Sequence, residues 1–158
     1  MNNKFLIVIL IGVIAVIAFA AAYSLGFIDS NEISNSADWQ TKNLSGLKFK
    51  VPSKYENGAM LTGNIVNGVT TADTYQSQDL NIILNSANWT DEFDKNMNSS
   101  TATTVLLEID GKEVTIFSEN GESVAFFQSN DDKILMFWHG DEAKGEIKAI
   151  IKSIFDLN

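Results

Sequence analysis

The sequence has no cysteine and no arginine, and it contains a single histidine and a single proline in 158 residues. Without cysteine the chain forms no disulfide, carries no thiol-linked lipid and performs no thiol chemistry. One histidine and no cysteine also exclude a typical zinc site, whose ligands are mostly of those two types. The stability of the fold must therefore come from the packing of apolar side chains.

Charge is absent from one long stretch near the N-terminus. Phe5 to Ile28 contains 24 residues without a charge or a proline. A helix of that length measures about 36 Å, more than the roughly 30 Å hydrocarbon core of a bilayer. Lys4 precedes the stretch, whereas Asp29 and Glu32 follow it, so the positive-inside rule places the N-terminus in the cytoplasm. We expect residues 1–28 to form a single-pass signal anchor in the cell membrane, with the rest of the chain outside.

The same stretch has a second interpretation as a cleaved signal peptide. Ala20-Ala21-Ala22 matches the small-residue pattern of a cleavage site, and cleavage after Ala22 would release a secreted domain beginning at Tyr23. However, the apolar run is longer than the roughly 7–15 residues of a usual signal-peptide core. Its length therefore favours the anchor.

The residues after Ile28 are strongly acidic. They hold all 20 acidic residues and ten of the eleven lysines, which gives a net charge of −10. This charge disfavours nucleic acid and favours cations or basic partners, and it also keeps an exposed domain soluble. Residues 29–43 are polar and without periodicity, which predicts a tether. We expect the folded domain to span residues 44–158.

The first half of this domain contains two clear strand patterns. Leu47 to Val51 alternates apolar and charged residues, and Leu80 to Leu84 is a compact apolar run. Between them, Tyr55 to Gln78 is interrupted by glycines. Its apolar pieces, Ala59 to Leu61 and Ile65-Val66, predict two short strands or a hairpin.

The second half predicts an antiparallel meander. Asp110-Gly111, Asn120-Gly121 and Asn130 to Asp132 separate its apolar runs. Asp-Gly and Asn-Gly supply the positive φ that tight hairpin turns require. The four predicted strands are Thr103 to Ile109, Glu113 to Ser118, Ser123 to Ser129 and Lys133 to Trp138.

Two helices are expected beside these strands. Trp89, Phe93 and Met97 recur every fourth residue and predict a short helix capped by Thr90. A C-terminal helix is expected after Asp141, which is suited to be its N-cap. The apolar stripe of this second helix comprises Ala143, Ile147, Ile150, Ile151 and Ile154.

The predicted sheet is apolar on both faces. Neighbours in a strand point to opposite sides, so Phe126-Phe127 and Phe137-Trp138 place aromatic rings on each face. The C-terminal helix can cover one face. The other face needs a second layer, formed by the early hairpin and the helix at Trp89, or it is kept for a partner. The predicted fold class is α+β, with an N-terminal transmembrane helix and an antiparallel sheet that carries helices on both faces.

These features resemble the PsbP-like α/β sandwich. The resemblance rests on Val51-Pro-Ser-Lys-Tyr55 after the first strand, on the meander, and on the final helix ending in Ile150-Ile-Lys-Ser-Ile-Phe155. It covers most of Leu44 to Asn158. It implies a central antiparallel sheet with helices on both sides, and a role as an accessory subunit or binding module rather than as an enzyme. It assigns no functional residue, because the matching positions belong to the core and the turns.

Catalytic motifs are weak. His139, in Trp138-His-Gly-Asp141, would have to serve any Ser-His-Asp arrangement, but no G-x-S-x-G motif presents a serine and Asp141 is better explained as a helix cap. Ser45-Gly-Leu-Lys48 matches S-x-x-K, although it runs into an alternating strand and loses the required helical spacing. An envelope hydrolase using His139 is therefore the less favoured alternative, and we expect no enzyme.

The acidic residues offer at most a loose calcium site. Asp94-x-Asn96-x-Asn98 begins like an EF-hand loop, but Ser99 replaces the turn glycine and Val105 stands where the bidentate glutamate should be. We expect no cofactor. The weak calcium candidates, whose default role is that of solvated acids, are Asp91, Glu92, Asp94, Asp131 and Asp132.

Two further patterns concern modification and association. Asn43, Asn88 and Asn98 begin N-x-[ST] sequons and would face outward, where a host with the machinery could attach glycans. Within the span, the small residues Ala18, Ala22 and Gly26 recur every fourth position, a spacing that allows helices to form a homodimer.

The sequence therefore predicts a single-pass membrane protein whose outer domain binds or scaffolds another component of the cell envelope without catalysis. The expected partners are the lipid bilayer and a protein of the envelope, and no nucleic acid.

Overall fold

The computed structural model describes residues 36–63, 65–66, 69–70, 72–140 and 145–158. The chain divides into two units, Met1–Glu32 and Ile33–Asn158, and every described residue belongs to the second. The predicted span from Phe5 to Ile28, with Ala18, Ala22 and Gly26, lies outside the described residues. Within the described ranges, no helix is both long and apolar enough to cross a membrane.

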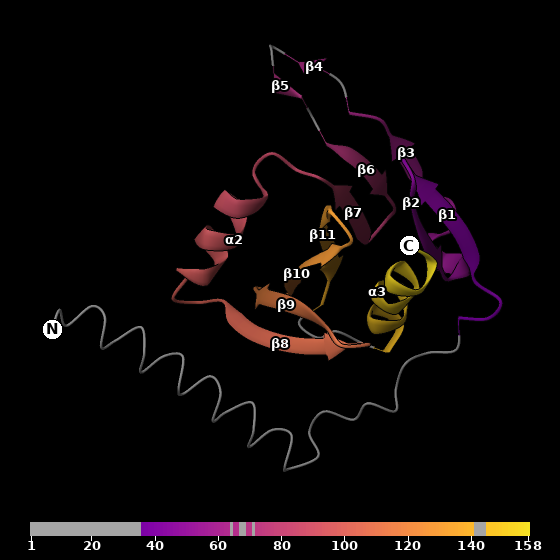
Figure 1. Ribbon diagram of the computed structural model, residues 1–158. Helices are drawn as coiled ribbons and strands as arrows, with labels where there is room; N and C mark the ends of the chain where they lie inside the picture. The colour runs from indigo at the N-terminus through magenta and orange to yellow at the C-terminus, as the bar shows by residue number, and fades with distance from the viewer. Residues whose placement is uncertain (1–35, 64, 67–68, 71, 141–144) are drawn as a thin grey trace, which may run out of the picture. The chain divides into compact units, whose positions relative to one another are not determined.

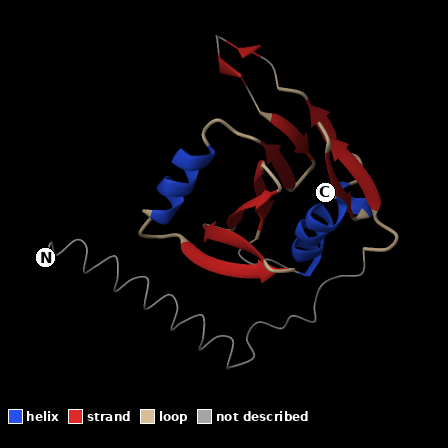
Figure 2. Ribbon diagram, viewed as in Figure 1, coloured by secondary structure: helices blue, strands red, loops and turns tan. Residues whose placement is uncertain are grey.

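The described residues form mostly antiparallel sheet together with two α-helices, so the α+β class is confirmed (Figures 1 and 2). A short 3-10 helix, η1, follows β2. In chain order the elements are β1 Gln40–Leu44, β2 Leu47–Val51, η1 Ser53–Tyr55, β3 Ala59–Leu61, β4 Ile65–Val66, β5 Val69–Thr70, β6 Asp73–Gln76, β7 Leu80–Leu84, α2 Trp89–Met97, β8 Thr103–Ile109, β9 Lys112–Glu119, β10 Glu122–Ser129, β11 Asp132–His139 and α3 Gly145–Leu157.

The central sheet has seven strands in the order β3-β6-β7-β11-β10-β9-β8, and all neighbours are antiparallel. Its larger part is the predicted meander β8 to β11, whose strands match the expected runs or extend one residue beyond them at either end. Asp110 and Asn120 have φ of 51° and 54°, and each is followed by a glycine with positive φ. These are the tight two-residue turns that the Asp-Gly and Asn-Gly pairs predict.

The folded chain begins earlier than the sequence predicts. The tether was expected to continue to Asn43, but β1 starts at Gln40 and pairs with β2 along its whole length. Ser45 and Gly46, with φ of 50° and 105°, form the turn of this hairpin. The S-x-x-K match is thus a β-turn leading into a strand. The sequence pattern does not predict β1, because most of its side chains are polar and exposed and only Leu44 is buried.

The region from Tyr55 to Gln78 contains the two predicted short strands, but they do not pair with each other. β3 pairs with β6, and β4 pairs with β5. The pattern did not reveal β6, Asp73–Gln76, because its buried residue, Tyr75, stands alone among polar neighbours. The two predicted short strands are therefore confirmed, whereas the alternative, a hairpin in which they pair with each other, is wrong.

The main hydrophobic core lies between the sheet and α3. Ile147, Ile150, Ile151 and Ile154 are buried there, as the apolar stripe predicts. Ala143 and Asp141 lie outside the described residues. The β1–β2 hairpin contributes Leu44, Leu47, Phe49 and Val51 to the same core, and Trp39 packs against it.

The free side of β2 is closed by polar side chains of α3 and of Asn158, the residue after it. Ser153 Oγ accepts a hydrogen bond from the N–H of Lys50 at 2.8 Å. Asn158 accepts from the N–H of Lys48 at 2.9 Å and donates to the Lys48 carbonyl at 2.8 Å. These backbone groups of β2 are therefore satisfied by side chains of α3 and of Asn158 rather than by another strand.

The opposite face of the sheet carries α2. Trp89 and Phe93 contact a smaller cluster of Phe117, Val124, Phe126 and Leu135. This helix begins at Trp89, and Asn88 makes no side-chain capping bond. Thr90 lies inside the first turn. The prediction that Thr90 caps the helix is wrong, because the turn already closes where the Trp89 N–H donates to the Ser86 carbonyl at 3.1 Å.

Candidate functional site: a trough at one end of the sheet

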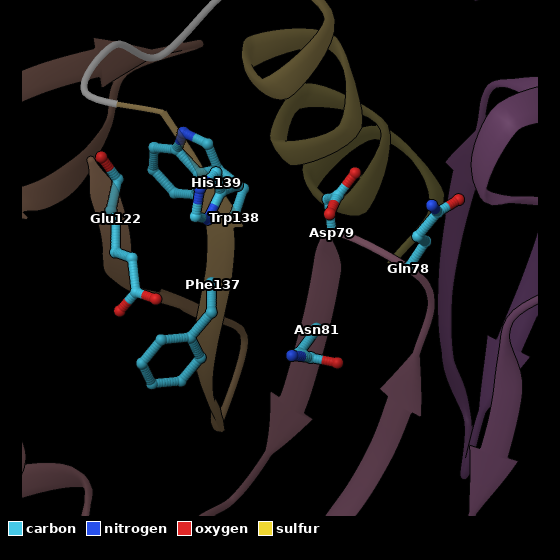
Figure 3. A pocket seen from close by; sticks show the side chains of 8 residues that line it. Gln78, Asp79, Asn81, Glu122, Phe137, Trp138 and His139 are labelled. Carbon is cyan, nitrogen blue, oxygen red and sulfur yellow. The ribbon is translucent and has the colours of Figure 1, made fainter.

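The helix α2 leaves one end of its sheet face open, and a shallow trough of about 270 Å³ lies there. Strands β7, β10 and β11 contribute to it at the point where β11 ends (Figure 3). Ligand sites for drug-sized molecules usually start at about 300 Å³, so the trough fits one side chain or a small head group. Its lining comprises Gln78, Asp79, Asn81, Glu122, Ser123, Phe137, Trp138 and His139.

Strand register places these side chains together. In β10 and β11, Glu122 is directly opposite His139, and Asn81 of β7 is opposite Phe137 of β11. Residues two apart in a strand share a face, so Phe137 and His139 point to the same side. The backbone N–H of His139 donates to the carbonyl of Asp79 at 3.3 Å, which fixes the segment before β7 against the end of β11.

The trough presents hydrogen-bond acceptors and an aromatic ring. The side chains of Asp79 and Glu122 are exposed, and Phe137 is half-buried between their strands (Figure 3). The Oδ1 atom of Asn81 is buried and has no hydrogen-bond partner. A buried acceptor without a donor costs about 1–3 kcal/mol. An arrangement of carboxylates beside an aromatic face is suited to a cationic group.

The histidine at the trough does not meet a serine nucleophile. Ser123 pairs with Trp138, one position from the Glu122–His139 pair, so its side chain points to the face opposite His139. Its hydroxyl is 2.7 Å from Ser118 Oγ and donates to the Gly140 carbonyl at 2.5 Å. The second predicted partner, Asp141, lies outside the described residues. The structure therefore joins His139 to Glu122 and Asp79 rather than to a catalytic serine.

The calcium candidates are divided between two elements. Asp91, Glu92 and Asp94 lie on α2, whereas Asp131 and Asp132 lie at the β10–β11 turn. Asp132 accepts a hydrogen bond from Asn85 at 2.7 Å. Across the part of the chain that the structure describes, no three acidic or histidine side chains come close enough to hold a metal ion.

The residues of the EF-hand-like motif belong to a helix and its end. Asn96 and Asn98 donate their amide N–H groups to the carbonyls of Glu92 and Asp94, each at 2.7 Å. Their side chains thus bond to the turn of α2 that precedes them. This geometry is that of a helix and not of a calcium-binding loop.

The three sequon asparagines are exposed. Asn43 lies in β1, where its Oδ1 accepts the Gly46 N–H at 2.8 Å. Asn88 precedes α2 and Asn98 follows it. Exposure is a condition that a glycan requires, so glycosylation stays a prediction for all three.

The tyrosines with perturbed pKa values belong to the support of the fold. Burial raises the pKa of Tyr75, although a hydrogen bond from the Gly58 N–H acts in the opposite direction. Burial likewise raises the pKa of Tyr55. For Lys54 burial acts to lower the pKa, but hydrogen bonds with Glu146 and Tyr55 outweigh it and raise the pKa. Lys54 and Tyr55 lie in η1, and the Lys54–Glu146 ion pair joins η1 to the first turn of α3.

Sequence reasoning singled out His139 but missed the other residues of the trough. The sequence contains enough information to predict that Glu122 lies opposite His139. A two-residue turn at Asn130-Asp131 pairs Ser129 with Asp132, and the same register pairs Glu122 with His139. No such signal exists for Asp79 and Asn81. They lie in or just before β7, whose residues are 50 or more positions from their partners in β11, and local patterns do not reveal which strands pair across that distance.

No protein-family model matches the sequence, and no curated protein matches it either.

Proposed function

We propose that the chain is a membrane-anchored, extracytoplasmic binding module that takes a basic group of another envelope component into the trough. The observation that carries the proposal is the pair of carboxylates, Asp79 and Glu122, on either side of Phe137 in the trough (Figure 3). A lysine side chain has three donors and no acceptor. It would supply the donors that this end of the sheet lacks.

Charge and size support a basic ligand. The trough is lined by two carboxylates and by no lysine, and the chain after Ile28 has a net charge of −10. Such a surface attracts cationic groups over distances of about a Debye length, roughly 8–10 Å at physiological salt. The volume of about 270 Å³ accommodates a side chain of a protein partner more readily than a large cofactor.

The anchor is the second part of the proposal. The run from Phe5 to Ile28 has the length and composition of a membrane span, and the charges that flank it favour a cytoplasmic N-terminus. The folded domain would then lie outside the cell membrane, joined by a tether that ends near Gln40. A secreted form, released after Ala22, is the alternative for the same domain.

The proposed role is non-catalytic. The hydroxyl of Ser123 is held by Ser118 and Gly140 on the opposite side of the sheet from His139. Within the trough, His139 is accompanied by carboxylates and an aromatic ring, which suit binding better than nucleophilic catalysis. We also propose kinship with PsbP-like domains, supported by an antiparallel sheet that has a helix on each side.

The experiment for the trough is a binding measurement with the full chain in lipid nanodiscs and a pentalysine peptide as the probe. Changing both carboxylates of the trough, Asp79→Asn with Glu122→Gln, should weaken binding roughly three- to tenfold, since two exposed ion pairs contribute on the order of 1 kcal/mol. The matched control is Glu113→Gln with Asp131→Asn, an equal charge change outside the trough at exposed positions. Equal losses in both double variants would show general attraction to acidic surface and would refute the trough.

The anchor has its own test. The intact mass of the native protein should be measured in carbonate-washed membranes and in the culture medium. A membrane-bound chain that includes Phe5 to Ile28 supports the anchor, and any added mass reports glycans. A soluble chain that starts at Tyr23 would replace the anchor by secretion and leave the trough proposal intact.

A further inference from the structure

The two edges of the seven-stranded sheet differ in how they are protected. One edge is β3, which has only three residues. The other is β8, with seven residues, and within the described part of the chain no strand lies on its outer side. Natural proteins shield long edges with charged side chains, proline or bulges. β8 contains no proline and only one charged residue, Glu108, and its apolar residues Val105 and Leu106 are 41% and 47% exposed.

Alternate residues of β8 direct their backbone N–H and C=O groups away from β9, toward the free edge. Ile109 and Lys112 flank the two-residue turn at Asp110-Gly111 and form the hydrogen-bonded pair that closes the hairpin. In an antiparallel ladder such pairs alternate with pairs whose N–H and C=O groups point outward. Going back along β8, the residues with outward backbone groups are Glu108, Leu106 and Thr104.

We propose that β8 pairs antiparallel with β8 of a second copy, with the two-fold axis at Leu106. The two Leu106 residues would then form a hydrogen-bonded pair, because each directs its N–H and C=O to the free edge. On either side of the axis Val105 faces Leu107 of the other copy. Thr104 faces Glu108 of the other copy, so no two carboxylates are opposite each other.

The composition of β8 selects this register over its neighbours. An axis at Val105 would place Leu106 opposite Thr104, and an axis at Leu107 would place it opposite the charged Glu108. Only the axis at Leu106 matches apolar side chains with apolar ones and leaves the single acidic residue of β8 beside a hydroxyl. This self-complementarity argues for a second copy rather than for an unrelated strand.

The pairing would also cover apolar surface. By register, Leu106 lies beside Thr115 on the face that carries α2, and Val105 lies beside Ile116 on the face that carries α3. An axis perpendicular to the sheet keeps both α2 helices on one face and both α3 helices on the other. The two sheets then continue into each other, and the exposed side chains at the edge acquire apolar neighbours.

Disulfide cross-linking of the full chain in membranes tests the proposal. Because the native chain has no cysteine, a single introduced cysteine can form a disulfide only with the same residue of another copy. In a hydrogen-bonded pair the Cα atoms are about 5.5 Å apart, a separation that a disulfide spans. Leu106→Cys should therefore form a covalent dimer under mild oxidation. The matched control is Leu61→Cys on the β3 edge, which is 48% exposed and should form little dimer.

The register has its own control. Val105→Cys alone should cross-link poorly, because the two copies of residue 105 are offset by two positions. Mixed with Leu107→Cys it should form the heterodimer. Efficient dimers from Val105→Cys alone, or equal yields from Leu106→Cys and Leu61→Cys, would overturn the proposed pairing.

Two charge substitutions at Leu106 distinguish a dimer formed through the β8 edge from a dimer formed through another surface. Leu106→Lys and Leu106→Glu should each weaken the dimer by more than about tenfold, measured as the mass of the particle in nanodiscs, because like charges would face each other across the axis. Mixing the two variants should restore the dimer as a heterodimer. A dimer that survives either substitution alone, as one held by Ala18, Ala22 and Gly26 would, refutes the inference, and so does a mixture that stays monomeric. Neither outcome depends on peptide binding at the trough.

Discussion

The two faces of the central sheet carry similar side chains but are covered very differently. Seven residues of α3 are buried, whereas α2 has none that is fully buried. The first face is further closed by the β1–β2 hairpin, whose four apolar residues join the same core. The second face is covered at one end by Trp89 and Phe93 and stays open at the other, where the trough lies.

This asymmetry assigns stability mainly to one face of the sheet and leaves the other face available for binding. A complete cover on one face is sufficient to remove most of the apolar side chains of the domain from water, which is the dominant favourable term in folding. The other face then needs only partial cover. A hollow of about 420 Å³ between α2, β9 and β10, together with the trough, belongs to this incompletely covered side. The face that contributes less to stability is the one left available for binding.

The adjacent residues Ile82 and Ile83 of β7 test the comparison most directly. Ile82 is fully buried on the α3 face, and Ile83 is only half-buried on the α2 face. Ile82→Ala should reduce the free energy of unfolding by about 2–5 kcal/mol, because it leaves a cavity in a closed core. Ile83→Ala should cost roughly 1 kcal/mol, since part of its surface is already in water.

Urea unfolding of the full chain, followed by tryptophan fluorescence, measures both variants under one condition. Equal losses would mean that the α2 face is packed as tightly as the α3 face, and the distinction between the faces would fail. A loss at Ile83 larger than that at Ile82 would reverse it.

A second prediction concerns the small aromatic cluster under α2. The ring of Phe93 lies 5.5 Å from Trp89, 5.6 Å from Phe117 and 5.3 Å from Phe126, measured between centroids. Phe93→Ala should lower the free energy of unfolding by about 1–2 kcal/mol, less than a fully buried phenylalanine, because the ring is half-buried.

The control for Phe93 is Met97, one turn further along α2. Met97 continues the predicted apolar stripe but is 53% exposed. Met97→Ala should change the stability by less than about 0.5 kcal/mol. A cost at Met97 similar to that at Phe93 would indicate that α2 covers more of the sheet than its contacts suggest.

Structural features that depend on neighbouring residues could be predicted from the sequence, whereas contacts between residues far apart in the sequence could not. The turns at Asp110-Gly111 and Asn120-Gly121 are set by local φ preferences, so the meander was predicted almost to the residue. The α3 stripe was predicted because helical periodicity is local as well. By contrast, the pairing of β7 with β11 joins residues about 50 positions apart, and nothing in the local pattern specifies it.

Gly58 is a single residue whose structural role could not be predicted from its sequence neighbours. Its sequence context predicts a turn, but a Cβ at this position would overlap the ring of Tyr75, which is completely buried. The glycine is therefore needed for close approach between β3 and β6 rather than for a positive φ. The candidate site divides in the same way, because His139 was singled out from the sequence whereas Asn81 reaches the trough only through the long-range pairing.

The smallest expected effect concerns the ion pair that attaches α3 to the β8–β9 turn. Lys152 donates to Asp110 at 2.6 Å and to Asp156 at 2.9 Å, and these hydrogen bonds raise the pKa of the lysine above its usual 10.5. A group whose pKa is raised by folding stabilises the fold fully below its unfolded pKa. That contribution is lost as the pH rises through the folded pKa, above 10.5.

Asp110→Asn isolates this contribution. At pH 8 the variant should be less stable than the native chain by about 0.2–1 kcal/mol, since the pair is partly exposed. The difference should shrink when urea unfolding is repeated above pH 10.5, because Lys152 is then losing its charge in both proteins. Buried tyrosines also titrate in this range and destabilise both proteins alike, so only the difference between them reports the lysine. A difference that stays constant with pH would mean that Asp110 stabilises the turn itself and that the charge of Lys152 contributes nothing to holding α3 on the closed face.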